Sequence, residues 1–314
     1  MTDQELAIKI RGLKKTYKAD GASKPKEALK GVDLSIPRGS IFGLLGPNGA
    51  GKSTTINIIA GIVDKSEGSV EVWGFDIDED IRNAKANIGI VPQEITFDVY
   101  FTPYEMLELY AGFYGIPKEE RRSDEILKAM RLEEQRDAYT RFLSGGMKRR
   151  LLVGKAMVHS PPILVLDEPT AGVDVELRKH IWEYVRELNK QGVTIVLTTH
   201  YLEEAEELCD EIAIINHGEL VICEKTPALL KQVDEKMVVI APVTPVNEVP
   251  DELKSIGGKL NDDGEIVIHF SPSSITVGEI LKKVSATDIE IADLRTEESD
   301  LEDIFLQLTK SKEG

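Results

Sequence analysis

The chain has few cysteines, no long apolar run and no apolar leader. Only Cys209 and Cys223 occur among its 314 residues. Two thiols without the spacing of metal ligands exclude a disulfide framework and indicate a reducing compartment. No apolar run approaches the ~20 residues needed to cross a bilayer. The first residues are acidic and lack the apolar segment of a secretory signal. These absences predict a cytoplasmic chain that is soluble by itself.

Basic residues are also scarce. The 38 Lys and Arg residues face 55 Asp and Glu residues, which gives a formal net charge of −17. Binding to a phosphate backbone needs concentrated Lys and Arg, so this balance argues against nucleic acid as the main partner. A hydrophobic fraction of 41% with 30% charged residues is ordinary for a globular protein with a sizeable core. The length predicts about two domains.

The chain does contain a glycine-rich segment between an apolar run and a helical pattern. The run Ile41–Leu45 is typical of a buried strand, and residues 55–60 are typical of a helix. Nine residues connect the two patterns: Gly46, Pro47, Asn48, Gly49, Ala50, Gly51, Lys52, Ser53 and Thr54. A P-loop needs this context, in which glycines let backbone amides turn toward phosphate oxygens. Lys52 would supply charge for the β- and γ-phosphates, and the Ser53 hydroxyl can ligate Mg²⁺. The segment predicts that the chain binds a nucleoside triphosphate.

A second apolar run, residues 163–166, leads directly into Asp167 and Glu168. This pattern is typical of a central parallel strand with carboxylates at its carboxyl end. Asp167 is predicted to belong to the Mg²⁺ shell, and Glu168 to polarise the water that attacks the γ-phosphate. A purely structural role for the pair has little support, because desolvated charges need partners.

Three single residues carry weaker signals. Gln93 leaves a strand pattern and can place its amide oxygen near Mg²⁺ and the γ-phosphate, although a lone polar residue there is more often a strand terminus. Tyr17 can stack on an adenine face or be an ordinary half-buried tyrosine. His200 ends the predicted strand over 193–199 in the same register as Asp167, where it can contact the γ-phosphate. The other histidines carry no motif and receive no role: His159, His180, His217 and His269.

A further helix start suited to an anion follows a helical segment. Residues 102–138 have amphipathic helical patterns and predict a helical insertion in an α/β core. Ser144 is a good N-cap, while Gly145 and Gly146 in the first turn cost up to ~1 kcal/mol each. That cost indicates a ligand close to the backbone, and the alternative is a plain serine cap before a loose turn. Asp174 can cap the next helix.

The order of these motifs resembles the ATP-binding cassette (ABC) family over roughly residues 6–223. The resemblance implies a P-loop NTPase fold of the α/β class, with a RecA-like core, an antiparallel β subdomain and an α-helical subdomain over about 94–158. The ATP-binding domain would span 1–225. The implied motifs are the Walker A loop at 46–54, the Q-loop at Gln93, the signature at Leu143-Ser144-Gly145-Gly146-Met147, Walker B with its catalytic glutamate at Asp167 and Glu168, the D-loop at Asp174, the switch histidine His200 and the aromatic A-loop at Tyr17.

Two departures from the family pattern matter. The signature usually ends in Gln where this chain has Met147, and the D-loop usually reads Ser-Ala-Leu-Asp where residues 171–174 read Ala-Gly-Val-Asp. Both variants are similar to the ABC-2 branch, the single-cassette ATPases of drug, polysaccharide or lipid exporters. They leave the core chemistry intact, because backbone amides and Ser144 would carry the phosphate contacts.

By this resemblance the chain is the ATPase subunit of an ABC-2 type exporter, using ATP and Mg²⁺ and working with a separate membrane permease. It would be peripheral at the inner face of the cell membrane. The family pairs cassettes head to tail, and one copy of each motif per chain then requires a homodimer. An importer ATPase and a non-transport cassette stay open as alternatives. The implied catalytic residues are Lys52, Gln93, Glu168 and His200, and the implied metal ligands are Ser53, Gln93 and Asp167.

Residues 226–314 form a separate predicted unit, a small α+β accessory domain. Strand patterns cover 236–241, 265–270 and 288–294, and helical patterns cover 273–284 and 299–308. Ser299 and Glu302 form a potential capping box at the start of the last helix. Support of the dimer is the favoured role, with regulation or stability as alternatives.

Overall fold

The computed structural model divides the chain into two compact units, Met1–Thr226 and Pro227–Gly314. It describes residues 5–18, 25–95, 99–170, 175–199, 201–232, 236–244, 246, 248–261, 263–270, 274–287 and 289–298. Within these ranges, no helix is both long and apolar enough to cross a membrane. Each unit has its own hydrophobic core.

A six-stranded, mostly parallel sheet forms the centre of the first unit. Its strand order is β10-β9-β3-β8-β7-β6, and only the β9–β10 pair is antiparallel. The strands are β3 (Ile41–Leu45), β6 (Ile88–Val91), β7 (Ile163–Asp167), β8 (Thr194–Thr199), β9 (Glu211–Asn216) and β10 (Glu219–Lys225). Every residue of β3, β7 and β8 is buried. Covered on both faces, β3 and β7 have the near-continuous apolar sequences typical of parallel strands, and β8 also buries three threonines.

A second, antiparallel sheet has the order β2-β1-β4-β5. Its strands are β1 (Leu6–Tyr17), β2 (Lys26–Pro37), β4 (Glu67–Val72) and β5 (Phe75–Asp76). Helix α1 (Lys52–Ile59) contributes Ile56, Ile58 and Ile59 to one core cluster together with strands of both sheets, such as Ile10 of β1 and Phe42 of β3. The predicted α/β fold with its antiparallel β subdomain is confirmed.

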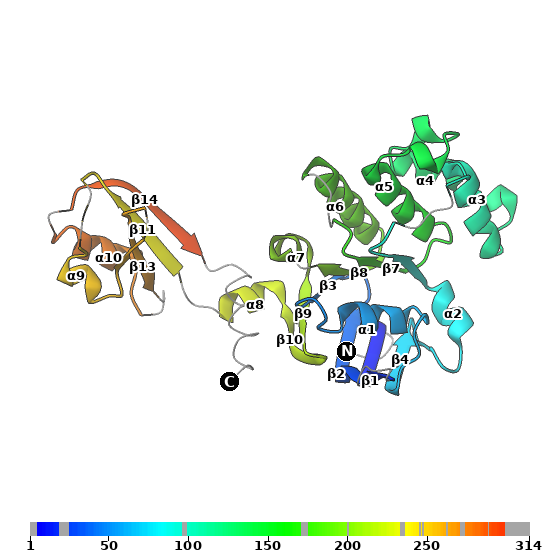
Figure 1. The fold of residues 1–314 in the computed structure, drawn as a ribbon, viewed down its shortest axis with the longest axis horizontal. Helices are drawn as coiled ribbons and strands as arrows, with labels where there is room; N and C mark the ends of the chain where they lie inside the picture. Colours follow the sequence, from blue (N-terminus) through cyan, green and yellow to red (C-terminus); the bar gives the residue numbers. More distant parts are fainter. Residues whose placement is uncertain are drawn as a thin grey trace. The chain divides into compact units, whose positions relative to one another are not determined.

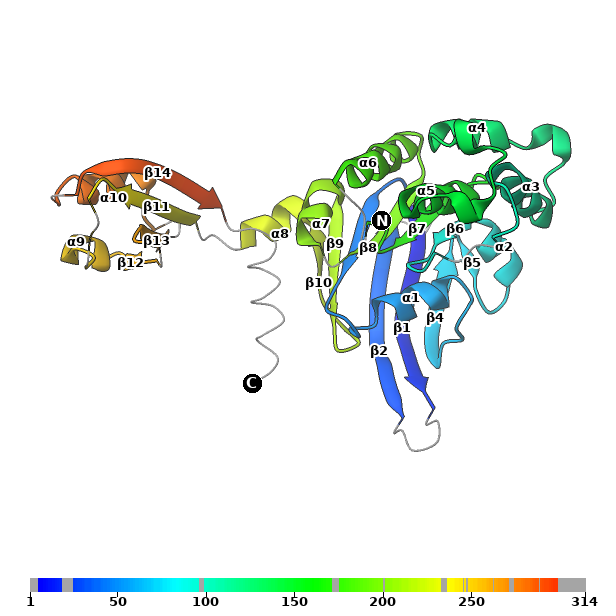
Figure 2. The same cartoon turned by 45° about the horizontal axis from the view of Figure 1, so that its top comes forward.

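The helical insertion lies between β6 and β7. It contains α3 (Pro103–Phe113), α4 (Ser123–Ala129) and α5 (Gly145–Ala156), which lie together in both views (Figures 1 and 2). Thr102 and Glu105 form a complete capping box at the start of α3, and Pro103 occupies its first turn. The remaining helices of this unit are α2 (Ile81–Ala86), α6 (Val175–Lys190) and α7 (Leu202–Leu208), and α8 (Thr226–Gln232) follows β10.

The second unit is a small four-stranded antiparallel sheet with two helices. Its elements follow the order β11 (Lys236–Pro242), α9 (Asp251–Lys254), β12 (Lys259–Leu260), β13 (Ile266–Phe270), α10 (Val277–Val284) and β14 (Ile291–Glu298). The strand order is β12-β13-β11-β14, so the chain forms a split β-α-β-β-α-β arrangement. Its core includes Val238, Ile268 and Ile280.

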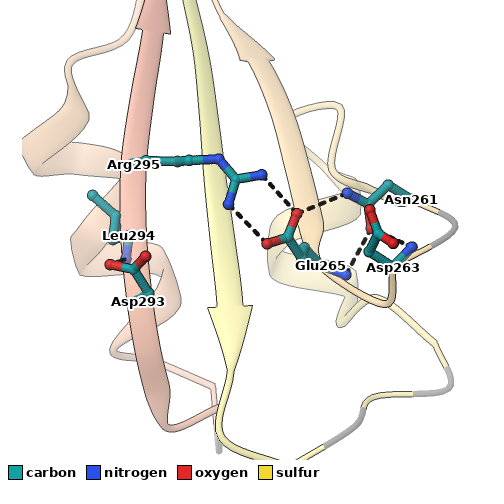
Figure 3. A network of polar contacts seen from close by, with 6 residues as sticks. All are labelled: Asn261, Asp263, Glu265, Asp293, Leu294 and Arg295. Atoms are coloured by element: carbon teal, nitrogen blue, oxygen red, sulfur yellow. Dashed lines mark hydrogen bonds and ion pairs between the residues drawn. The ribbon is translucent and has the colours of Figure 1, made fainter.

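Polar contacts on this sheet join strands that are distant in sequence. Arg295 of β14 binds Glu265 through two bonds of 2.8 Å each, and Figure 3 shows the pair reaching across β11. Asn261 also donates to Glu265, at 2.9 Å. These bonds lower the pKa of Glu265, with the Arg295 guanidinium as the largest cause. The predicted strand over 288–294 begins later, at Ile291, and the predicted helix over 299–308 lies outside the described residues.

Candidate nucleotide-binding site

The glycine-rich loop joins β3 to α1 in a conformation that only glycine tolerates at two points. Gly46 has φ +156°, and a Cβ there would lie 2.1 Å from the carbonyl oxygen of Ile215. Gly51 is the N-cap of α1 with φ +117°, and its Cβ would meet the backbone oxygen of Ala28 at 2.9 Å. Close packing against neighbouring backbone therefore fixes the loop, and the helix start that follows can bind an anion.

Lys52 opens α1 and is almost fully buried. Its ammonium group donates to the carbonyl oxygens of Gly46, at 2.6 Å, and Pro47, at 3.2 Å. Burial lowers the pKa of Lys52, while Glu168 and Asp167 act in the opposite direction. The positive charge therefore lies inside the loop, in the electrostatic field of both carboxylates.

A cavity of about 380 Å³ gathers the predicted nucleotide contacts. Tyr17 lines it at the end of β1, and Gln93 and Glu168 line it from the central sheet. The loop and α1 contribute Asn48, Gly49, Gly51, Lys52, Ser53 and Thr54 to the same lining. Lys26 and Ala28 of β2 complete the lining, so residues from five separate sequence segments share one concave site beside the carboxyl ends of the parallel strands.

The two carboxylates at the end of β7 are fixed by β8. The Thr198 hydroxyl donates to Asp167 Oδ1, and the Glu168 amide donates to the carbonyl oxygen of Thr198 at 3.1 Å and to its hydroxyl oxygen at 3.0 Å. Glu168 has φ +46°, a left-handed backbone conformation that is unfavourable for its residue type. The sequence analysis did not single out Thr198, because its role depends on the pairing of β8 with β7.

Gln93 lies within hydrogen-bond distance of Glu168. Its amide nitrogen donates to Glu168 Oε2 at 2.9 Å. The prediction concerned its amide oxygen and Mg²⁺, whereas the bond in the structure uses the other end of the amide. An amide can make both contacts at once, because its oxygen remains an acceptor.

Ser144 begins α5 as its N-cap, and its hydroxyl oxygen accepts from the Met147 amide at 3.2 Å. A Cβ added at Gly145 would meet nothing within 4 Å, so the space over this helix start is open. Ser144, Gly146 and Met147 line a second cavity of about 340 Å³. None of its lining residues lines the P-loop cavity.

Asp174 and His200 lie outside the described residues. Thr170 and Glu204, which lie four positions from Asp174 and from His200 respectively, meet at the buried Glu204 carboxylate. The Thr170 hydroxyl donates to both oxygens of Glu204 at 3.0 Å, and the Trp182 indole donates to Oε1 at 2.8 Å. The acidic sequence over 201–209 favours a solvent-facing helix, but Glu204 is only 1% exposed, so this side of α7 faces inward. The acidic composition of α7 gives no sign in the sequence that one of its glutamates is buried.

Comparison with known proteins decides the family. The ABC transporter family model matches residues 29–171. The linearmycin resistance ATP-binding protein LnrL of Bacillus subtilis is 37% identical over 292 residues, which cover 90% of this chain and 94% of LnrL. The chain belongs to the ABC transporter family. As an ABC ATPase it binds ATP, and its hydrolysis of ATP is coupled to transport.

Two further comparisons support this assignment. The Nod factor export ATP-binding protein I of Paraburkholderia xenovorans is 36% identical to the ABC ATPase over 311 residues, 97% of each chain. A solved dimeric ATP-binding cassette in a post-hydrolysis state, bound to ADP and phosphate, has a TM-score of 0.64 and 31% identity. That likeness covers 70% of this ABC ATPase and 98% of the solved chain.

Proposed function

We propose that the chain is the ATPase subunit of an ABC-2 type exporter and works as a homodimer on a separate membrane permease. The observation that carries this proposal is the separation of the Ser144 cavity from the P-loop cavity. A head-to-tail partner supplies Ser144 against the ATP held by residues 46–54 of the other chain. ATP then completes the contact, and its hydrolysis releases the two chains.

Within each site, the chain's own residues divide the work. Lys52 and the loop amides, from Gly46 through Thr54, hold the phosphate charge, and Tyr17 stacks on adenine. Glu168 orients the attacking water and accepts its proton, while Gln93 restrains that carboxylate. His200 contacts the γ-phosphate from the end of β8. In trans, the backbone of Gly145, Gly146 and Met147 joins Ser144, and Asp174 contributes from the D-loop.

Magnesium fits this arrangement as an ion shared with ATP. Among the described residues, no group of three His, Cys, Asp or Glu side chains is placed to hold a metal ion. Mg²⁺, however, keeps waters and phosphate oxygens and needs few protein ligands. Ser53, Gln93 and Asp167 would hold it, and its charge would stabilise the transferring phosphoryl group. The bond from Thr198 orients Asp167 for that role.

The direction of transport follows from the relatives. The names of LnrL and of the Nod factor protein refer to linearmycin resistance and to Nod factor export. Both align with this chain over at least nine-tenths of its length, accessory unit included. Export across the cell membrane, with this subunit at its cytoplasmic face, is therefore the proposed direction.

The permease would bind the helical insertion. Tyr100 and Phe113 are 72% exposed and Phe142 is 70% exposed, so three aromatic side chains of this insertion are accessible to a partner. We assign the ATP-binding domain to 1–225, its helical subdomain to about 94–158 and the accessory domain to 226–314. The division of the chain at Thr226 supports this assignment. The accessory domain is proposed to support the dimer.

Affinity purification of the full chain from detergent-solubilised membranes tests the proposal. The expected result is one co-purifying polytopic membrane protein, whose presence stimulates ATP hydrolysis. An extracellular substrate-binding protein in the same complex would instead indicate an importer. Ribosomal proteins as the partners would exclude transport.

A further inference from the structure

Arg149 is a buried cation on the helix that begins at Ser144. It is 3% exposed, and one guanidinium nitrogen donates to the carbonyl oxygen of Pro92 at 2.9 Å. Its Nε atom is also buried and has no hydrogen-bond partner. A buried guanidinium with an unused donor is costly, so its presence needs a reason other than packing.

The electrostatic reason lies at the end of β7. Burial lowers the pKa of Arg149, and the negative charges of Asp167 and Glu168 oppose that shift. The guanidinium of Arg149 therefore interacts electrostatically with both carboxylates. A cation on α5 thus stabilises the negative end of the hydrolytic site in the same chain.

The hydrogen bond of Arg149 has a second consequence for this site. Pro92 directly precedes Gln93, and the Gln93 amide donates to Glu168 at 2.9 Å. Any displacement of α5 therefore pulls on the backbone next to the side chain that restrains Glu168. The path from helix to carboxylate consists of two hydrogen bonds and one peptide unit.

We propose that Arg149 is a positioning residue that couples the two ATP sites of the dimer. The proposal rests on the proposed function, in which Ser144 contacts the ATP bound by the partner chain. Arg149 follows Ser144 by five residues, ~7.5 Å along one rigid helix. When the partner's ATP draws in the start of α5, Arg149 moves with it and shifts Pro92, Gln93 and thereby Glu168. Each site then becomes competent only when the other is filled.

A double-mutant cycle on the full chain tests this coupling. Arg149→Met removes the charge and the bond while keeping the length of the side chain, and Arg149→Lys keeps the charge without the planar fork. Misplacing a catalytic group by about 1 Å costs up to ~100-fold in rate, so we expect Arg149→Met to lower kcat by ~10- to 100-fold. KM for ATP should change less than ~3-fold, because the P-loop is intact. The Hill coefficient for ATP should fall toward one, because the two sites are no longer coupled. Rates are normalised to the nucleotide-binding fraction, and Arg149→Lys should fall between wild type and Arg149→Met.

The decisive comparison uses Gln93→Ala. If Arg149 acts through Gln93, the double variant has the same kcat as Gln93→Ala alone, within ~2-fold. Lys155→Met is the matched control: it removes a half-buried cation from the same helix, one that lies over the Tyr110 ring. We expect Lys155→Met to lower kcat only slightly, and its effect on kcat should multiply with that of Gln93→Ala in the double variant.

If the wild-type chain hydrolyses ATP, two results would overturn this inference. One is that the effects of Arg149→Met and Gln93→Ala on kcat multiply in the double variant. The other is that Arg149→Met leaves the Hill coefficient for ATP unchanged. A wild-type chain that binds ATP but never hydrolyses it, even with its permease, would overturn the proposed function as well.

Discussion

The amide nitrogen of Gln93 lies 2.9 Å from Oε2 of Glu168, so the segment after β6 holds the carboxylate at the end of β7. The two residues are 75 positions apart in sequence. They meet because β6 and β7 are parallel neighbours whose carboxyl ends open into the same cavity. In our account, this bond presents Glu168 to the water that attacks ATP.

Replacing Glu168 by Gln should abolish turnover and spare binding. The neutral amide still accepts a bond from Gln93 but cannot take a proton from water, so kcat should fall ~1,000-fold. ATP affinity should change less than ~3-fold, because Glu168 is not among the proposed phosphate ligands. Steady-state phosphate release and equilibrium ATP binding measure the two quantities. Glu71→Gln, at a half-buried ion pair with Lys9 in the antiparallel sheet, is the control. Wild-type turnover in Glu168→Gln would rule out Glu168 as the proposed base.

Alanine at Gly46 should destroy the loop. Its Cβ would overlap the backbone oxygen of Ile215, and its backbone would be strained, so the free energy of unfolding should fall by ~3 kcal/mol or more. ATP binding should be lost. The control is Gly39→Ala, where φ is also positive but nothing lies within 4 Å, and a loss of only ~1 kcal/mol is expected. Urea denaturation measures both; equal losses would contradict the steric argument.

Tyr17 should contribute to ATP affinity through its ring alone. Stacking of a base on an aromatic side chain is worth ~1–3 kcal/mol, so Tyr17→Ala should weaken ATP binding by ~10-fold. Tyr17→Phe keeps the ring and should bind within ~2-fold of wild type. Calorimetric titration in the Glu168→Gln background avoids hydrolysis. Normal affinity in Tyr17→Ala would exclude adenine stacking.

His159 should make the first unit less stable in acid. Burial lowers its pKa to about 4, against a bond to the carbonyl oxygen of Ile88, and its ring stacks on Tyr114 with centroids 3.7 Å apart. Above pH ~6.5 the ring is neutral in both states, so its stabilisation is fully present. As the pH falls toward 4, only the unfolded state takes up the proton, and stability is lost. Partial exposure limits the loss to ~2 kcal/mol.

The matched variant is His159→Phe, which keeps an aromatic ring on Tyr114 and cannot be protonated. Urea denaturation at pH 7 and pH 4.5 should show a smaller decrease in unfolding free energy for this variant than for wild type. An equal decrease in unfolding free energy for the two proteins would show that protonation of His159 does not cause the loss of stability.

Much of the first unit could be predicted because its signals are local. The apolar runs of β3 and β7 each lead into residues that line one cavity, and the glycines of the P-loop all lie in one continuous segment. Thr198, Arg149 and Glu204 could not be assigned in this way. Their roles depend on strand register or on contacts between distant helices, and no short pattern records these.

The second unit was harder for a different reason. Helix α9 has four residues and β12 has two, too short for any hydrophobic period to appear. The register of β14 follows from pairing with β11 along its length, which continues through the charged residues Glu297 and Glu298. A predicted boundary at residue 294 followed the last apolar side chain, whereas backbone pairing extends the strand further.

The oligomeric mass of Glu168→Gln, measured by light scattering with and without ATP, tests whether bound ATP joins two chains. We expect a monomer without nucleotide and a dimer with ATP, because each ATP joins Lys52 of one chain to Ser144 of the other. Adding Ser144→Arg to the same chain should keep ATP bound but leave the protein monomeric. A Glu168→Gln chain that binds ATP and stays monomeric at high concentration, in the absence and presence of its permease, would show that ATP does not join two chains.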